Sequence, residues 1–393
     1  MDGSKAAVRY RVKDDEKARL FQEIIRHDAT TRKSLAASLR LRPNSVSDAV
    51  QELKEDGLIL EEAETIEGRT GRPQWIIRPN LERFTAVSYY VEGRSLKCGL
   101  VHLGGKALAL QSRALPQESS SEEIGEAMLD LFGSVRRAVP ASSELIGIGV
   151  SLVGTVQPLT HLWVNTARWP HLKRLDLGRL FASASLPLTV RRSLDTELEY
   201  MLDLNPAYRQ KNVALFHWGY GIGTAFAYGG KILSSSIGRF GEIGHTQILS
   251  GEGRPCLCGE SGCIETEAAL WALMPELKKV NSEIPDDEEE IMPFLSGEIC
   301  RLPAMQRAAD RIVSALSLYY KLFYPDVFLL TGPFFCVHEI YERITGGFAA
   351  SLSEYAKGNV SFELIRDGFS GCLSGGVKHF FEQKLVGYLV ARG

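Results

Sequence analysis

The sequence predicts an α/β protein of three parts: a small helical module at the amino terminus, followed by two related α/β lobes with a cleft between them. Helical periodicity dominates the first 80 residues and gives way to alternating strands and helices after Pro79. Two later segments, 86–114 and 212–236, repeat one three-stranded plan. The length of 393 residues is sufficient for two or three domains, each with its own core.

Three short helices are predicted in the first 60 residues. Residues 16–26 carry apolar side chains at helical spacing. The pair Thr30 and Thr31 can cap a second helix. Pro43 suits the first turn of a third helix, which stops at Gly57.

A two-stranded hairpin is predicted after the third helix, from residues 58–60 and 75–77, with a turn rich in Gly and Arg at 68–73. Three helices followed by such a wing are typical of a winged helix-turn-helix, in which the third helix enters the major groove of DNA and the wing enters a minor groove. The alternatives are a solvated helix face and an ordinary hairpin turn. The residues expected to contact DNA are Arg32, Lys33, Asn44, Ser45, Ser47, Gln51, Arg69 and Arg72.

Charge and cysteine content restrict the class of protein. The formal net charge is -3, but the stretch from 30 to 47 holds four cations and no carboxylate, which is compatible with a small DNA-reading surface. No apolar run reaches the roughly 18 residues that span a bilayer, and the first 20 residues lack the apolar core of a signal peptide. We therefore expect a cytoplasmic protein with no membrane partner.

The two lobes are expected to follow the module in sequence. We predict a DNA-binding domain at 1–80 and a first lobe at 81–195, which residues 370–393 are expected to complete. The second lobe is expected at 196–369. A cleft between such lobes is a preferred place for a ligand.

The strongest chemical signal lies between residues 241 and 267. His245, Cys256, Cys258 and Cys263 supply one imidazole and three thiols, enough to close a tetrahedral zinc site. Four protein ligands leave no position for a catalytic water, so the predicted Zn²⁺ is structural. The alternative is three buried thiols beside a core histidine.

The same segment resembles a known family. Gly-Glu-Ile-Gly-His at 241–245, followed by G-x-x-C-x-C-G-x-x-G-C-x-E at 253–265, is similar to the signature of the ROK family of repressors, open reading frames and sugar kinases. The amino-terminal helices and Gly-Arg-Pro at 71–73 resemble its repressor branch, which includes the xylose and N-acetylglucosamine repressors. The resemblance extends over about residues 15–385.

The resemblance implies an actin-like, two-lobed fold and a set of sugar-binding residues: Asn165, Glu242, His245 and Glu265. Carboxylates and an amide suit sugar hydroxyls, because they accept and donate hydrogen bonds in pairs. His245 would place one ring nitrogen on zinc and orient the other toward the sugar. The alternative for the two glutamates is a surface or helix-capping role.

The sequence departs from the kinases of the family at their catalytic positions. Where the kinases have D-x-G-G-T, residues 90–94 read Tyr-Val-Glu-Gly-Arg, and Ser193 stands at the position of the catalytic aspartate. A serine without an activating partner is a poor general base. The Gly-rich run 219–224 survives as a possible anion cradle, although such a run is more often a tight hairpin, and segment 329–333 keeps one glycine. We expect neither kinase activity nor productive ATP binding.

The resemblance, together with the predicted winged helix, implies a sugar-responsive repressor of carbohydrate metabolism that binds operator DNA as a dimer or tetramer, with a sugar in the interlobe cleft. One alternative is a sugar kinase with an attached DNA-binding domain, using Asp195 as its base. Another is a repressor with a vestigial pocket that answers to a protein partner. An activator would use the same DNA-reading parts.

Overall fold

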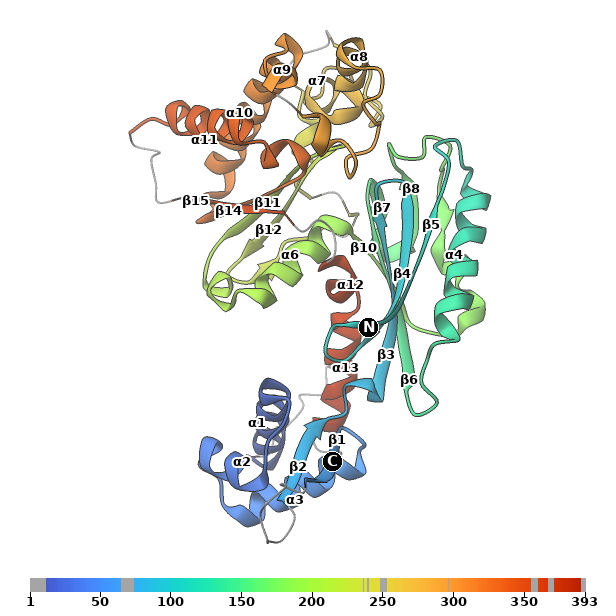
Figure 1. The fold of residues 1–393 in the computed structure, drawn as a ribbon, viewed down its shortest axis with the longest axis vertical. Coiled ribbons are helices and arrows are strands. Elements are labelled where there is room, and N and C mark those ends of the chain that lie inside the picture. The colour runs from blue at the N-terminus through green and yellow to red at the C-terminus, as the bar shows by residue number, and fades with distance from the viewer. Residues whose placement is uncertain are drawn as a thin grey trace, which may run out of the picture.

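The amino-terminal module is a three-helix unit closed by an antiparallel hairpin (Figure 1). The computed structural model describes residues 12–64, 74–235, 237–238, 240–247, 253–295, 297–354, 360–366 and 371–389. Within this module the elements are α1 (Val12–His27), α2 (Arg32–Leu39), α3 (Pro43–Glu55), β1 (Ile59–Glu64) and β2 (Gln74–Pro79).

Local sequence explains where these helices begin and end. The Thr31 hydroxyl accepts a hydrogen bond from the Ser34 N–H at 3.1 Å, as an N-cap residue does. Pro43 opens α3, where its missing N–H costs nothing. The buried stripe of α3 consists of Val46, Val50 and Leu53. The three expected helices and the hairpin are therefore present.

Two five-stranded sheets follow, and they share one topology. The first has the order β10-β6-β3-β4-β5 and the second the order β13-β12-β11-β14-β15. In each sheet three antiparallel strands come first in sequence, and two parallel strands are added on the side of the first of them. The three-stranded pattern that repeats in the sequence therefore forms the three antiparallel strands of each sheet. Their strands are β3 (Phe84–Glu92), β4 (Ser95–His102), β5 (Ala107–Ala114), β6 (Glu144–Leu152), β10 (Leu188–Arg192), β11 (Val213–Trp218), β12 (Ile222–Tyr228), β13 (Lys231–Ile232), β14 (Val327–Thr331) and β15 (Ser361–Ile365).

Helices cover both sheets. In the first lobe α4 (Ser121–Arg136) packs on β4 and β5, and a small sheet of β7 (Thr155–Gln157), β8 (Leu162–Asn165) and β9 (Leu175–Asp176), with α5 (Leu177–Leu180), extends the lobe. In the second lobe several helices share one large apolar core. These are α7 (Glu265–Ala268), α8 (Leu270–Val280), α9 (Gly297–Cys300), α10 (Pro303–Phe323) and α11 (His338–Ser351).

Helix α6 (Ser193–Leu204) joins the two lobes. It continues directly from β10 of the first sheet, yet its buried Leu198 and Leu202 pack with apolar residues of the second sheet. Two carboxyl-terminal helices, α12 (Gly371–Gly375) and α13 (Lys378–Leu389), return to this junction. The predicted boundary between residues 195 and 196 falls inside α6 and stays a prediction.

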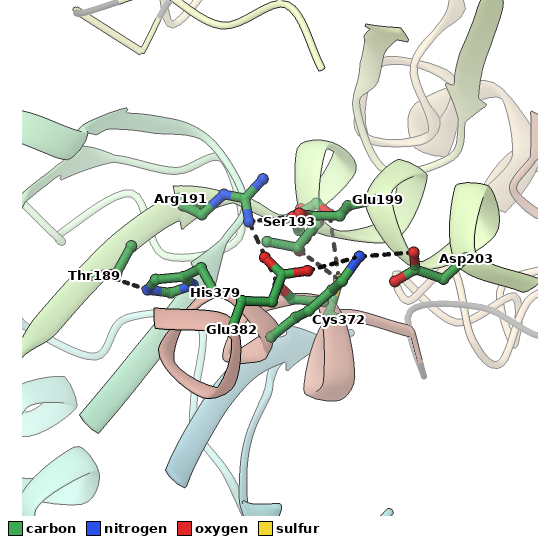
Figure 2. Close-up of polar contacts among 11 residues, drawn as sticks. Thr189, Arg191, Ser193, Glu199, Asp203, Cys372, His379 and Glu382 are labelled. Carbon is green, nitrogen blue, oxygen red and sulfur yellow. Dashed lines mark hydrogen bonds and ion pairs between the residues drawn. The ribbon is translucent and has the colours of Figure 1, made fainter. Parts of the chain in front are cut away.

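Polar contacts hold this junction together (Figure 2). The Cys372 thiol donates to the Ser193 carbonyl at 3.3 Å, and Lys378 Nζ lies 2.7 Å from Asp203 Oδ1. His379 Nε2 lies 2.8 Å from the Thr189 hydroxyl on β10. The carboxyl-terminal helices are therefore tied both to the first sheet and to the connecting helix.

One apolar cluster unites the amino-terminal module, the edge of the first lobe and α13. It joins Leu20 and Phe21 of α1 with Phe84 of β3 and with Phe380 and Phe381 of α13. No helix among the described residues is both long and apolar enough to cross a membrane.

Candidate functional site

A cavity of about 400 Å³ lies between the two lobes. The first lobe contributes residues 152–155, the end of β8 and the start of α6. The second lobe contributes the turn between β11 and β12 and two segments from the predicted metal motif. All four residues expected to bind sugar line this cavity: Asn165, Glu242, His245 and Glu265.

Glu265 is the most enclosed of these side chains. It begins α7, only 8% of its surface is exposed, and its Oε1 accepts a hydrogen bond of 2.9 Å from the Ile222 N–H. Burial raises the pKa of this carboxyl, while the nearby His245 opposes the rise. Its carboxyl oxygens are of the type that accepts hydrogen bonds from ligand hydroxyls.

Glu242 is partly exposed and lines the cavity. Its Oε2 lies 3.7 Å from His245 Nε2, and its Oε1 lies 3.5 Å from Arg192 Nη1. Glu242 is thereby positioned by one group from each lobe, because Arg192 ends β10 of the first sheet. Its carboxylate accepts hydrogen bonds, as vicinal hydroxyls require.

Asn165 is exposed at the end of β8, on the first-lobe wall. Trp169, four residues later, is fully buried and meets Trp163 edge-to-face at 5.9 Å between ring centroids. This aromatic pair anchors the strand that carries Asn165. Gly154, at φ 84, lies against the Asn165 carbonyl, where a Cβ would overlap that oxygen.

The four predicted metal ligands meet in one cluster. The ligand atoms of His245, Cys256, Cys258 and Cys263 all lie within 4.8 Å of one another. His245 Nδ1 faces the Cys256 thiol at 3.4 Å, so its other ring nitrogen is the one that lies near Glu242. Burial raises the pKa of the Cys256 and Cys263 thiols. A divalent cation would supply the positive charge that their thiolate forms require.

Ser193, at the position where the family resemblance expects a catalytic aspartate, lines the cavity. Asp195, the alternative base, lines a neighbouring cavity of about 710 Å³ instead. Both of its oxygens accept hydrogen bonds from Arg192, at 2.6 and 3.2 Å. This carboxylate is therefore directed away from the site and neutralised by a guanidinium.

The Gly-rich run at 219–224 forms the tight turn between β11 and β12. Its N–H groups already bind carboxylates of the chain: the Tyr220 N–H donates to Glu288 at 2.5 Å, and the Ile222 N–H donates to Glu265. The run is thus both a hairpin turn and an anion cradle.

The profile of the ROK family matches residues 91–373. The chain belongs to the ROK family. This ROK chain is 24% identical over 340 residues to the DNA-binding transcriptional dual regulator NagC of Escherichia coli, covering 82% of this chain and 81% of NagC.

Kinases are also related to this ROK chain. A glucokinase of Halalkalibacterium halodurans is 30% identical over 135 residues, which span 34% of this chain and 40% of the glucokinase. Among solved structures, a ROK family transcriptional regulator that is a homologue of the Escherichia coli MLC protein aligns over 96% of this chain and 99% of its own, at 20% identity with a TM-score of 0.68. The actin-like fold of the family is therefore the fold of this chain.

Most of the described residues of this ROK chain that are expected to contact DNA are exposed. Lys33, Asn44, Ser47 and Gln51 are exposed, and Ser45 is half-buried. Arg69 and Arg72 lie outside the described residues.

Although the stretch 30–47 contains no carboxylate of its own, Arg32 meets one from the hairpin. Its Nη2 lies 2.9 Å from Glu61 Oε1. The hairpin, distant in sequence, returns Glu61 to the start of α2, which no local window of sequence can show.

Three further residues at the site escaped sequence reasoning. Arg168 and His217 line the cavity, and the buried Glu288 lies behind them. Glu288 belongs to the run Asp-Asp-Glu-Glu-Glu at 286–290, which has the composition of a solvated loop. The one sign of these residues in the sequence was His217, a histidine within the apolar strand 213–218.

Proposed function

We propose that this protein is a sugar-responsive transcriptional regulator, in the first instance a repressor of carbohydrate metabolism acting in the cytoplasm. The observation that carries the proposal is the interlobe cavity, which gathers two carboxylates, an amide and an imidazole at hydrogen-bonding positions. About 400 Å³ suits a monosaccharide-sized ligand. The relationship to NagC over most of both chains supports the regulatory role.

The amino-terminal module supplies the proposed DNA-reading part. The family profile begins at residue 91, beyond the helices and hairpin of residues 12–79. We propose that α3 enters the major groove with Asn44, Ser45, Ser47 and Gln51 toward the bases, while Arg32 and Lys33 contact phosphates. Arg69 and Arg72 of the wing would reach a minor groove. With the module at 1–80, the lobes are proposed at 81–195 with 370–393, and at 196–369.

Self-association completes the proposed regulator. A dimer or tetramer would present paired modules to a pseudo-palindromic operator, with half-sites about one or two helical turns apart. A sugar that changes the spacing of the modules weakens DNA binding, and DNA weakens sugar binding by the same factor.

The cysteine cluster supports a structural zinc site. Zinc bonds of about 2.0–2.3 Å place tetrahedral ligands about 3.3–3.8 Å apart. The 3.4 Å from His245 Nδ1 to Cys256 Sγ and the 3.7 Å between Cys258 Sγ and Cys263 Sγ agree with this spacing. The four residues would hold the ion and fix the ring of His245, whose Nε2 then orients Glu242 in the cavity.

Three observations favour a regulator over a kinase. Ser193 faces the cavity where a base would be required, and Asp195 is bound by Arg192 on the other side. Glu288 occupies the Tyr220 N–H of the Gly-rich turn. Phe334, on the segment after β14, is fully buried 4.6 Å from the Trp218 ring, so aromatic packing fills that region.

The proposal is tested by two linked measurements on the full-length, zinc-loaded protein. Selection from random DNA duplexes should enrich a two-fold symmetric sequence. A thermal-shift screen of monosaccharides and amino sugars should give a hit that also releases this DNA. A ligand at 100 times its dissociation constant stabilises by about 2.7 kcal/mol.

Matched variants separate the two sites. Glu265→Gln should abolish the sugar response and keep DNA affinity, whereas Asn44→Ala should lower DNA affinity and keep the sugar response. Failure to enrich any duplex would refute the regulator. Hexose-dependent ATP hydrolysis that is lost in Asp195→Ala would establish the kinase instead. DNA binding without any sugar response would favour a protein partner as the signal.

A further inference from the structure

A buried carboxylate lies at the back of the interlobe cavity. Glu288, in the segment between α8 and α9, is 4% exposed and is contacted from both lobes. Arg168 of the first lobe donates to its Oε1. From the second lobe, His217 Nε2 lies 3.2 Å from its Oε2, and the Tyr220 N–H donates to that oxygen at 2.5 Å.

These three donors form a set that binds an anion. A guanidinium, an imidazole and a backbone N–H at a Gly-rich turn are the groups that bind phosphate or carboxylate in proteins. Gly219 permits the close approach, because a Cβ at this position would overlap the Glu288 carboxylate. Although burial alone would raise the pKa of Glu288, Arg168 and His217 hold it well below its usual value. The carboxylate is therefore ionised and serves as the anion.

The segment around Glu288 also spans the cleft. Arg94, in the turn between β3 and β4 of the first lobe, binds Asp286 with 2.8 Å between Nη2 and Oδ2. Arg168 donates a second hydrogen bond to the Gly93 carbonyl in the same turn, at 3.0 Å. The acidic segment is thus held against the first lobe at two neighbouring points.

This arrangement of ion pairs determines which charges in the cavity lining are neutralised. Its two arginines are both neutralised by buried carboxylates, Arg168 by Glu288 and Arg192 by Asp195. The other charged groups in the lining are acidic: Glu242, Glu260 and Glu265. The cavity therefore offers hydrogen-bond acceptors without a free guanidinium among its described lining residues, which disfavours a ligand that carries phosphate.

We propose that Glu288 is an internal anion that occupies the phosphate-binding donors of the cleft and thereby restricts the effector to an uncharged sugar. This inference rests on the proposed sugar-binding role of the cavity and names its ligand class. Nucleotides and phosphorylated sugars are rejected because their phosphate would have to displace a carboxylate that is covalently part of the chain. Glu288 is thus a specificity-determining residue.

The test measures inorganic phosphate binding to full-length variants, by thermal shift and titration calorimetry at constant ionic strength. Glu288→Ala and Glu288→Gln should both gain saturable phosphate binding, with a dissociation constant at least tenfold lower than that of the wild type. Glu290→Gln is the matched control, since it removes an exposed carboxylate from the same segment. It should behave as the wild type.

Two variants keep the result decisive. If Glu288→Ala does not fold, Glu288→Gln, which retains the size of the side chain, carries the test. A folded variant that gains no phosphate binding overturns the proposal, as does a wild type that binds phosphate equally well. The phosphate readout requires neither a sugar nor DNA, so its failure is distinct from failure of the proposed regulator.

Discussion

Glu197 predicts how the stability of this protein depends on pH. It lies on α6 with 3% of its surface exposed, and its Oε2 is 3.8 Å from the Cys372 thiol at the junction of the lobes. Burial raises the pKa of this carboxyl from 4.5 to about 8, against the hydrogen bonds from Cys372, which lower it. The folded protein therefore holds a proton here that the unfolded chain releases.

The sign and size of the effect follow from linkage. Between pH 4.5 and about 8 the folded state binds the extra proton, so stability falls as the pH rises, by at most about 1.4 kcal/mol per unit. From pH 5 to 8 the loss amounts to about 3.5 kcal/mol. For 393 residues the entropy of unfolding is about 0.8 kcal/mol per degree, which converts this loss to about 4 °C.

Replacing Glu197 by Gln removes the proton equilibrium and keeps the shape. We expect the melting temperature of Glu197→Gln, relative to the wild type, to rise progressively from pH 5 to pH 8, when both are measured by differential scanning fluorimetry. Glu122→Gln, an exposed position on α4, should follow the wild-type curve throughout. A difference between Glu197→Gln and the wild type that stays constant with pH would refute the reasoning.

Three further outcomes are expected. Removing zinc with a strong chelator should lower the melting temperature. Cys258→Ser should lower it as well, whereas the control Leu257→Ser should not. Protein that is purified without zinc and whose melting temperature does not respond to chelator would contradict the metal site. In the capping box of α4 the Ser120 hydroxyl accepts a hydrogen bond from the Glu123 N–H. Ser120→Ala removes this bond and should lower the free energy of unfolding, measured by denaturant titration, by about 1 kcal/mol. Leu198 is fully buried between α6 and the second sheet. Leu198→Ala should therefore lower the free energy of unfolding by about 2–5 kcal/mol. A loss under about 0.5 kcal/mol would show that α6 is not firmly packed there.

Sequence reasoning succeeded where the determining interactions are local. Thr31 and Pro43 mark helix starts because caps depend on neighbouring backbone groups. The spacing of Cys256, Cys258 and Cys263 predicted a cluster, because side chains on one short segment of chain stay close together. The duplicated strands were visible because repetition needs no knowledge of contacts.

Sequence reasoning failed where distant segments meet. Glu288 lies 120 residues from Arg168, and its acidic neighbours give it the composition of an exposed loop. Arg32 and Glu61 are likewise brought together only when the hairpin folds back. The small sheet of β7 to β9 has strands of two to four residues, too short for periodicity to reveal. Each of these features depends on tertiary packing, which overrides local composition.

The packing of α13 against α1 has a consequence for mechanical coupling between the lobes and the amino-terminal module. Phe380 and Phe381 of α13 share an apolar cluster with Leu20 and Phe21 of α1. The same helix is bound to the first sheet through His379 and to α6 through Lys378. Because a close-packed core transmits strain, a displacement of α13 at the junction of the lobes is passed on to α1.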